Sequence, residues 1–208
     1  MALVKLNNRG VRSVSTFGSI SSLGTYTFIK KITASSSATV SFVNGSSDVV
    51  LDGTYKEYLF TFKDIHPATD NQHFQFNASS DSGSNYNVTK TTTLFQAEHN
   101  EADDSAAVGY KTALDLAQST AAQCLVQGVN YANDSMCSGY MHLYAPSDTT
   151  FVKHFISCMG ATMGGGGDFI QPNYVSGYLN TTSAVDAIQF SMASGNIDAG
   201  DICLYGIN

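Results

Sequence analysis

The stretch YKEYLFTFKDI, residues 55–65, decides the fold class of this chain. Tyr58, Phe60 and Phe62 occupy every second position, so an extended backbone places their side chains on one face of a strand. Aromatic residues favour strands, and alternation over this length is typical of a strand with one buried face. The stretch therefore predicts a core strand of a β-sheet.

Further alternating runs lie on both sides of this strand, separated by short segments rich in Gly, Asn, Asp and Ser, which form turns. They are ITASSSATVSFV, HFQFNAS, VTKTTTLFQA, SGYMHLYAP, TFVKHFISCMG, YVSGYLN, AVDAIQFSM and DICLYGI. So many short strands predict an all-β protein, a two-sheet antiparallel β-sandwich of about eight to ten strands. The last two runs are expected to form a closing hairpin in one core sheet, residues 187–207, with Asn196 and Gly200 in its turn.

Residues 98–138 interrupt the alternation. Ala and Leu dominate residues 110–117, which favours one short helix. The surrounding Asn, Asp and Ser predict a long loop around that helix. Long ordered loops on β scaffolds commonly carry contacts.

Charge divides the chain into two parts. The first 47 residues contain five Lys or Arg and no acidic residue, whereas residues 48–208 contain five Lys and all seventeen Asp and Glu. We therefore expect an extended basic docking arm, residues 1–31, followed by a β-sandwich body, residues 32–208. The arm residues expected to contact a partner are three basic ones, Lys5, Arg9 and Arg12, and four apolar ones, Val11, Val14, Phe17 and Ile20.

No motif for catalysis or for binding a cofactor stands out. There is no G-x-S-x-G sequence, and the run MGGGGD, residues 163–168, lacks the Lys-Ser/Thr of a phosphate-binding loop. The four cysteines are widely spaced, so we expect free thiols. The acidic stretch EHNEADD, residues 98–104, is compatible with a hard cation, but a solvated loop explains it more simply. We expect no enzymatic activity, no metal and no cofactor.

Composition also argues against two classes of partner. The net charge of −7 repels nucleic acid. No apolar run approaches the roughly 18 residues of a transmembrane helix, and the N-terminal residues lack the apolar region of a secretory signal. We expect neither nucleic-acid binding nor membrane insertion.

Several stretches, taken together, resemble a group of structural proteins from tailed phages of the marine, cyanophage-like kind. They are LNNRGVRSVSTFGSI (6–20), YKEYLFTFKDI (55–65), DSGSNY (81–86), TFVKHFIS (150–157) and IQFSMASGNIDAGDICLYGI (188–207). The resemblance implies a virion protein assembled in the host cytoplasm, with a jelly-roll-like sandwich and other capsid or tail proteins as partners. A head decoration or fibre, a tail appendage and a baseplate part all remain open. Self-association is expected, and we expect a trimer.

Glycan binding is the alternative, because jelly-roll sandwiches often bind sugars and the chain contains eleven Tyr. A sugar platform needs exposed aromatic rings beside Asp, Asn or Gln. Two segments expected in loops, GVNYANDS and IQPNYVSGY, supply such mixtures. Their candidate residues are Tyr131, Asn133, Asp134, Asn173, Tyr174 and Tyr178. This hypothesis describes a lectin-like protein that recognises the host surface.

Overall fold

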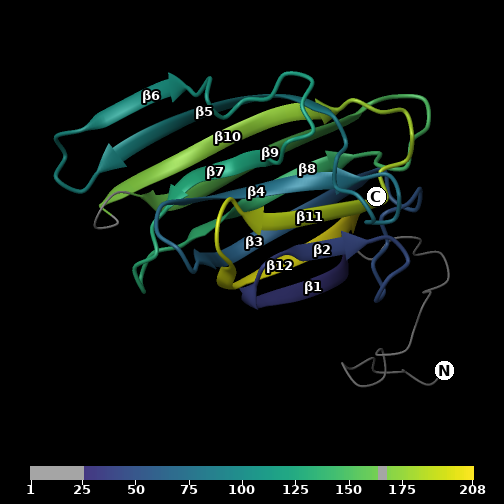
Figure 1. Ribbon diagram of the computed structural model, residues 1–208, viewed down its shortest axis with the longest axis horizontal. Helices are drawn as coiled ribbons and strands as arrows, with labels where there is room; N and C mark the ends of the chain where they lie inside the picture. The colour runs from purple at the N-terminus through teal and green to yellow at the C-terminus, as the bar shows by residue number, and fades with distance from the viewer. Residues whose placement is uncertain (1–25, 164–167) are drawn as a thin grey trace, which may run out of the picture.

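The computed structural model describes residues 26–163 and 168–208, and it is built of β-strands (Figure 1). No helix occurs in these two ranges. The twelve strands are β1 (Tyr26–Ser37), β2 (Val40–Val43), β3 (Glu57–Pro67), β4 (Gln72–Ser79), β5 (Lys90–Asn100), β6 (Ala106–Tyr110), β7 (Gln123–Val129), β8 (Cys137–Tyr144), β9 (Lys153–Met163), β10 (Phe169–Leu179), β11 (Ala187–Met192) and β12 (Ile197–Ile207). The prediction of an all-β protein is confirmed, with more strands than expected.

The strands form two antiparallel sheets that pack as a β-sandwich. The larger sheet has eight strands in the order β1-β12-β3-β8-β9-β10-β5-β6, and the smaller has four in the order β2-β11-β4-β7. The smaller sheet lies over part of the larger one, and β7 contacts β9 and β10 (Figure 1). Beyond β7 the larger sheet continues through β5 to β6, where all five residues are exposed.

Alternation in β3 builds the core as predicted. Tyr58, Phe60 and Phe62 are buried and face the smaller sheet. There Phe60 and Phe62 meet Phe190 of β11, at ring-centroid distances of 5.3 and 5.0 Å. The stretch that indicated the fold class therefore contributes Phe60 and Phe62 of the larger sheet to an aromatic cluster between the two sheets.

The predicted closing hairpin is wrong. β11 pairs with β2 and β4 in the smaller sheet, whereas β12 pairs with β1 and β3 in the larger sheet. Placing the two strands in opposite sheets brings their apolar residues into the core from both layers. Gly200 lies within β12 rather than in a turn, at φ +127°, where β12 shifts its register against β3.

The predicted short helix over residues 110–117 is also wrong. Tyr110 ends β6, and the backbone that follows makes one local turn, in which the Leu114 amide donates to the Lys111 carbonyl at 3.1 Å, and otherwise bonds to β5. The Lys111 amide donates to the Leu94 carbonyl at 2.9 Å, and the Leu116 amide donates to Thr92 Oγ1 at 2.8 Å. Tertiary hydrogen bonds thus replace the helical ones that Ala and Leu favour locally.

The predicted boundary between arm and body at residue 31 falls inside β1. Residues 26–31 pair with β12, from Tyr26 opposite Ile207 to Lys31 opposite Cys203. They belong to the larger sheet and form one of its edges.

Candidate functional site

The outer face of the larger sheet, the face turned away from the smaller sheet, gathers most of the exposed large apolar side chains. Inward-pointing residues of these strands are buried, so their neighbours in sequence point outward. The exposed members of this outer face are Tyr26, Phe28, Phe95, Val108, Tyr110, Tyr140, Ile156, Ile170 and Tyr174. An exposed apolar surface on this scale typically marks an interaction site.

Strand register aligns four of these aromatic residues in one row. Tyr110 lies opposite Phe95, Phe95 opposite Tyr174, Tyr174 opposite Cys158, and Cys158 opposite Tyr140. The Phe95 and Tyr174 rings are stacked, with centroids 5.0 Å apart and planes 13° apart. Such cross-strand aromatic pairs stabilise a sheet and hold the rings in fixed positions.

A shallow groove of about 340 Å³ lies beside this row. Its outward-facing lining includes Thr93, Ser176 and Ile156, which are cross-strand neighbours on β5, β10 and β9. Tyr178 and His154 face each other at its far end, with ring centroids 6.0 Å apart. We call the aromatic row and this groove the aromatic face: Phe95, Tyr110, Tyr140, Ile156, Tyr174, Tyr178 and His154.

Two phenol groups of the aromatic face, those of Tyr110 and Tyr174, have a raised pKa. The neighbouring Cys158, through its charge and a hydrogen bond, raises the pKa of Tyr174 above its ordinary value. The Tyr110 hydroxyl donates to Asp115 Oδ2 at 2.6 Å, and this bond raises the pKa of Tyr110. The face offers aromatic rings for stacking and hydroxyls for hydrogen bonds.

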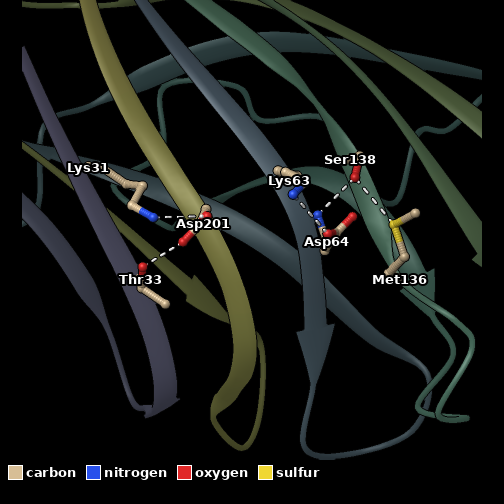
Figure 2. A network of polar contacts seen from close by, with 7 residues as sticks. All are labelled: Lys31, Thr33, Lys63, Asp64, Met136, Ser138 and Asp201. Atoms are coloured by element: carbon tan, nitrogen blue, oxygen red, sulfur yellow. Dashed lines mark hydrogen bonds and ion pairs between the residues drawn. The ribbon is translucent and has the colours of Figure 1, made fainter. Parts of the chain in front are cut away.

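The other end of the outer face, over β1, β12 and β3, carries a group of charged side chains (Figure 2). Asp201 accepts a hydrogen bond from Thr33 Oγ1 at 2.5 Å and forms an ion pair with Lys31 at 3.2 Å. The Thr33 bond and then the Lys31 bond lower the pKa of Asp201. Nearby, Lys63 pairs with Asp64 at 3.6 Å. Figure 2 shows these side chains on three neighbouring strands, so the aromatic face has a polar border here.

The candidate glycan residues lie in three different places. Tyr174 and Tyr178 belong to the aromatic face, on β10 rather than on a loop. Asn173 is buried and points inward, where its Nδ2 donates to the Gln171 carbonyl at 3.1 Å. Sequence neighbours on a strand thus face opposite sides of the sheet.

The other three candidates lie on the connection between β7 and β8. The Tyr131 side chain is 55% exposed. Asn133 and Asp134 line a separate open cavity of about 520 Å³, together with His66 of β3 and Asp198 of β12. The structure therefore does not bring the two predicted sugar-binding segments together.

The seven candidate docking residues of the arm lie outside the described residues. They are Lys5, Arg9, Val11, Arg12, Val14, Phe17 and Ile20.

Sequence reasoning missed most of the aromatic face. Phe95, Tyr140 and Ile156 each occupy an outward position in an alternating run, which could have been read from the sequence. Their proximity depends on strand register and on strand order, which alternation does not reveal.

Within residues 26–163 and 168–208, no three His, Cys, Asp or Glu side chains are grouped to hold a metal ion. The same part of the chain has no helix that is long and apolar enough to span a membrane.

Comparison with known proteins yields no relative: no family model matches the chain, and neither the curated proteins nor the solved structures include a significant match.

Proposed function

We propose that this protein is a non-enzymatic structural component of a phage particle, a capsid decoration or fibre or a tail appendage, attached to another virion protein by its basic N-terminal arm. The aromatic face carries this proposal. It is a broad, rigid surface on sheet strands, rich in aromatic side chains and suited to contact with another macromolecule.

We propose that the sandwich is a jelly roll, a fold used by viral capsid and lectin domains. The strand order supports this. If β5, β6, β9 and β10 are treated as additions, eight strands remain. One sheet then has the order β1-β12-β3-β8, which are the first, eighth, third and sixth of the eight strands along the chain. The other has the order β2-β11-β4-β7, which are the second, seventh, fourth and fifth. This interleaved order results when a long antiparallel hairpin wraps around the core as Greek keys.

The charge division supports attachment through the arm. Lys5, Arg9 and Arg12 precede β1, whereas the body is strongly acidic. A basic segment of this kind steers toward and pairs with acidic groups of a partner, and its four apolar residues add contact area. In this proposal the arm anchors the protein, and the aromatic face remains free for a second contact.

Charge reversal in the arm tests the anchoring role. We expect the full-length variant Lys5→Glu, Arg9→Glu, Arg12→Glu to lose binding to particles that lack this protein, because each pair becomes a repulsion. The matched control reverses three lysines of the body, Lys30, Lys56 and Lys63, and should bind like the native chain. Binding is measured by co-sedimentation of purified protein with particles. Equal binding of the native chain and the arm variant would contradict the arm as anchor.

Recognition of a host-surface glycan is the second candidate function, favoured by the groove of the aromatic face. The groove places Tyr178 and His154 beside the hydroxyls of Thr93 and Ser176. Aromatic rings next to hydroxyl groups match the alternating apolar and polar faces of a sugar ring. The Phe95–Tyr174 stack would extend this platform to a second sugar unit.

Two tyrosine substitutions test glycan recognition. If a glycan binds this groove, Tyr178→Ala should weaken binding on a glycan array about tenfold, since the loss of a ring contact costs about 1 kcal/mol or more. Tyr131→Ala is the control, because Tyr131 is an exposed tyrosine that lies off the aromatic face. Unchanged binding by Tyr178→Ala, or an equal loss in both variants, would exclude this groove as the glycan site.

A further inference from the structure

The strand β6 forms an edge of the larger sheet that lacks the usual protection against pairing. Its sequence is AAVGY, without a charge or a proline, and all five residues are exposed. Val108, at its centre, is 79% exposed. Its pairing with β5 runs from Phe95 opposite Tyr110 to His99 opposite Ala106 without a bulge. A flat, uncharged, exposed edge of this kind is a template for pairing with another strand.

The other sheet edges among the described residues are protected. β1 carries Lys30 and Lys31 and shifts its register between Phe28 and Lys30. β2 has only four residues. β7 is almost entirely buried, and its pairing with β4 is irregular. Lysines, bulges, short length and burial are the devices that natural sheets use to block edge pairing. β6 has no lysine, no bulge and no burial, and with five residues it is one residue longer than β2.

Backbone geometry shows which groups of β6 are open. The Lys111 amide donates to the Leu94 carbonyl, and the Asn100 amide donates to the Ser105 carbonyl, so residues 105 and 111 turn toward β5. Because polar backbone groups alternate along a strand, residues 107 and 109 also turn toward β5. The amides and carbonyls of Ala106, Val108 and Tyr110 therefore point away from the sheet.

We propose that β6 pairs antiparallel with β6 of a second copy of this chain, which joins two larger sheets into one continuous sheet. The two-fold axis passes through Val108, and each Val108 exchanges two hydrogen bonds with its counterpart. Each Ala106 lies opposite Tyr110 of the other copy and exchanges two more, so all three open residues are paired. This self-complementary arrangement closes as a dimer. It is independent of the virion role.

Side chains and charges fit this register. Tyr110 lies over the small Ala106 of the other copy, so a large residue meets a small one. No charged residue faces itself across the axis. Lys111 of each copy comes next to the acidic turn between β5 and β6 of the other copy, which contains Glu101, Asp103 and Asp104. The bodies stay apart because β5 and β6 extend beyond the smaller sheet (Figure 1).

The dimer has a consequence for the aromatic face. Tyr110 and Val108 share the outer side with Phe95, and antiparallel pairing about this axis keeps outer sides together. The two aromatic faces therefore become one surface that spans both copies. A two-fold assembly through β6 replaces the trimer expected from the sequence.

The first test compares the mass in solution of the native chain with that of the variant Val108→Lys. Because an interface this small is typically transient, sedimentation is measured over a concentration series up to roughly 0.1 mM. The native chain should reach twice the mass of the 22.1 kDa monomer. Val108→Lys should stay monomeric with an unchanged circular dichroism spectrum, since it places two lysines opposite each other at an exposed position. A native monomer or trimer at the highest concentration, or a dimer that survives this substitution, would overturn the proposal.

Cysteine cross-linking tests the register itself. In this pairing the two Val108 Cα atoms are about 5.5 Å apart, within disulfide range, so oxidised Val108→Cys should form a covalent dimer. The matched control is Ala107→Cys on the same strand, whose two Cα atoms would be about 8 Å apart and out of range. Oxidation of the native chain is a second control, because Cys158 and Cys203 are only half-buried and could themselves form cross-links. Equal cross-linking of both variants, or none in Val108→Cys, would refute this register.

Discussion

Phe190→Ala is expected to lower the free energy of unfolding by about 4 kcal/mol, the cost of removing a large aromatic side chain from a close-packed core. Phe190 is fully buried at the centre of β11. Its ring packs against Phe60 and Phe62 of the larger sheet, and against Phe42 and Phe74 of its own sheet, with centroids 5.0 to 6.3 Å away. Neighbours from both sheets cannot collapse into the space without moving the layers together. Urea unfolding followed by circular dichroism measures the loss.

Phe151→Ala is the control for this experiment. Phe151 is the same residue type but is 72% exposed, so its truncation should change the free energy of unfolding by no more than about 0.5 kcal/mol. Similar losses in both variants would show that Phe190 is not a core residue. Phe190→Asp is expected to prevent folding altogether, because it would bury a carboxylate without a partner.

The buried Lys90 is expected to make stability depend on pH. Its Nζ donates to Asn77 Oδ1 at 2.6 Å and to the Val88 carbonyl at 2.9 Å, and no carboxylate of the described residues pairs with it. Burial lowers the pKa of Lys90 from 10.5 to about 8. Between these two values the unfolded chain binds a proton that the folded chain does not, so stability rises with pH in this window.

Comparison with Lys90→Met isolates this effect from other groups that titrate in the same window. The unfolding free energy of the native chain, relative to the variant, should rise by about 3 kcal/mol from pH 8 to pH 10.5. Below pH 8 the difference should be flat. Lys56→Met, which changes an exposed lysine, should show no such rise. A flat difference across the whole range for Lys90→Met would mean that Lys90 titrates normally in the folded protein.

The sequence predicts the local structure of this protein better than its topology. The alternation of Tyr58, Phe60 and Phe62 follows directly from burial of one strand face, and the structure confirms it. The hairpin prediction failed because alternation shows which side of a strand is buried and does not show which sheet the strand joins. β11 and β12 carry patterns suited to either arrangement. The helix prediction failed because hydrogen bonds to Thr92 and Leu94 outweighed the local preference of Ala and Leu.

The candidate site shows the same limit. Tyr174 and Tyr178 were identified from the sequence, but Asn173 was grouped with them although its side chain points to the opposite, inner side of the sheet. Phe95 and Tyr140 come next to Tyr174 through pairings among β5, β10, β9 and β8, and residue type alone carries no information about these pairings. The same is true of the open edge of β6, which depends on its being last in the sheet.

The position of β12 bears on how fast the protein folds. β12 follows the other eleven strands in the sequence, yet it lies between β1 and β3, and β1 has no other strand partner in its sheet. During synthesis, β1 and β3 must therefore remain unpaired on this side until β12 has left the ribosome. Contacts between segments so distant in the chain form slowly, and exposed strand edges invite aggregation meanwhile. Folding of the larger sheet should thus be a late event that benefits from chaperones, whereas the pairing of β9 with β10 can form early.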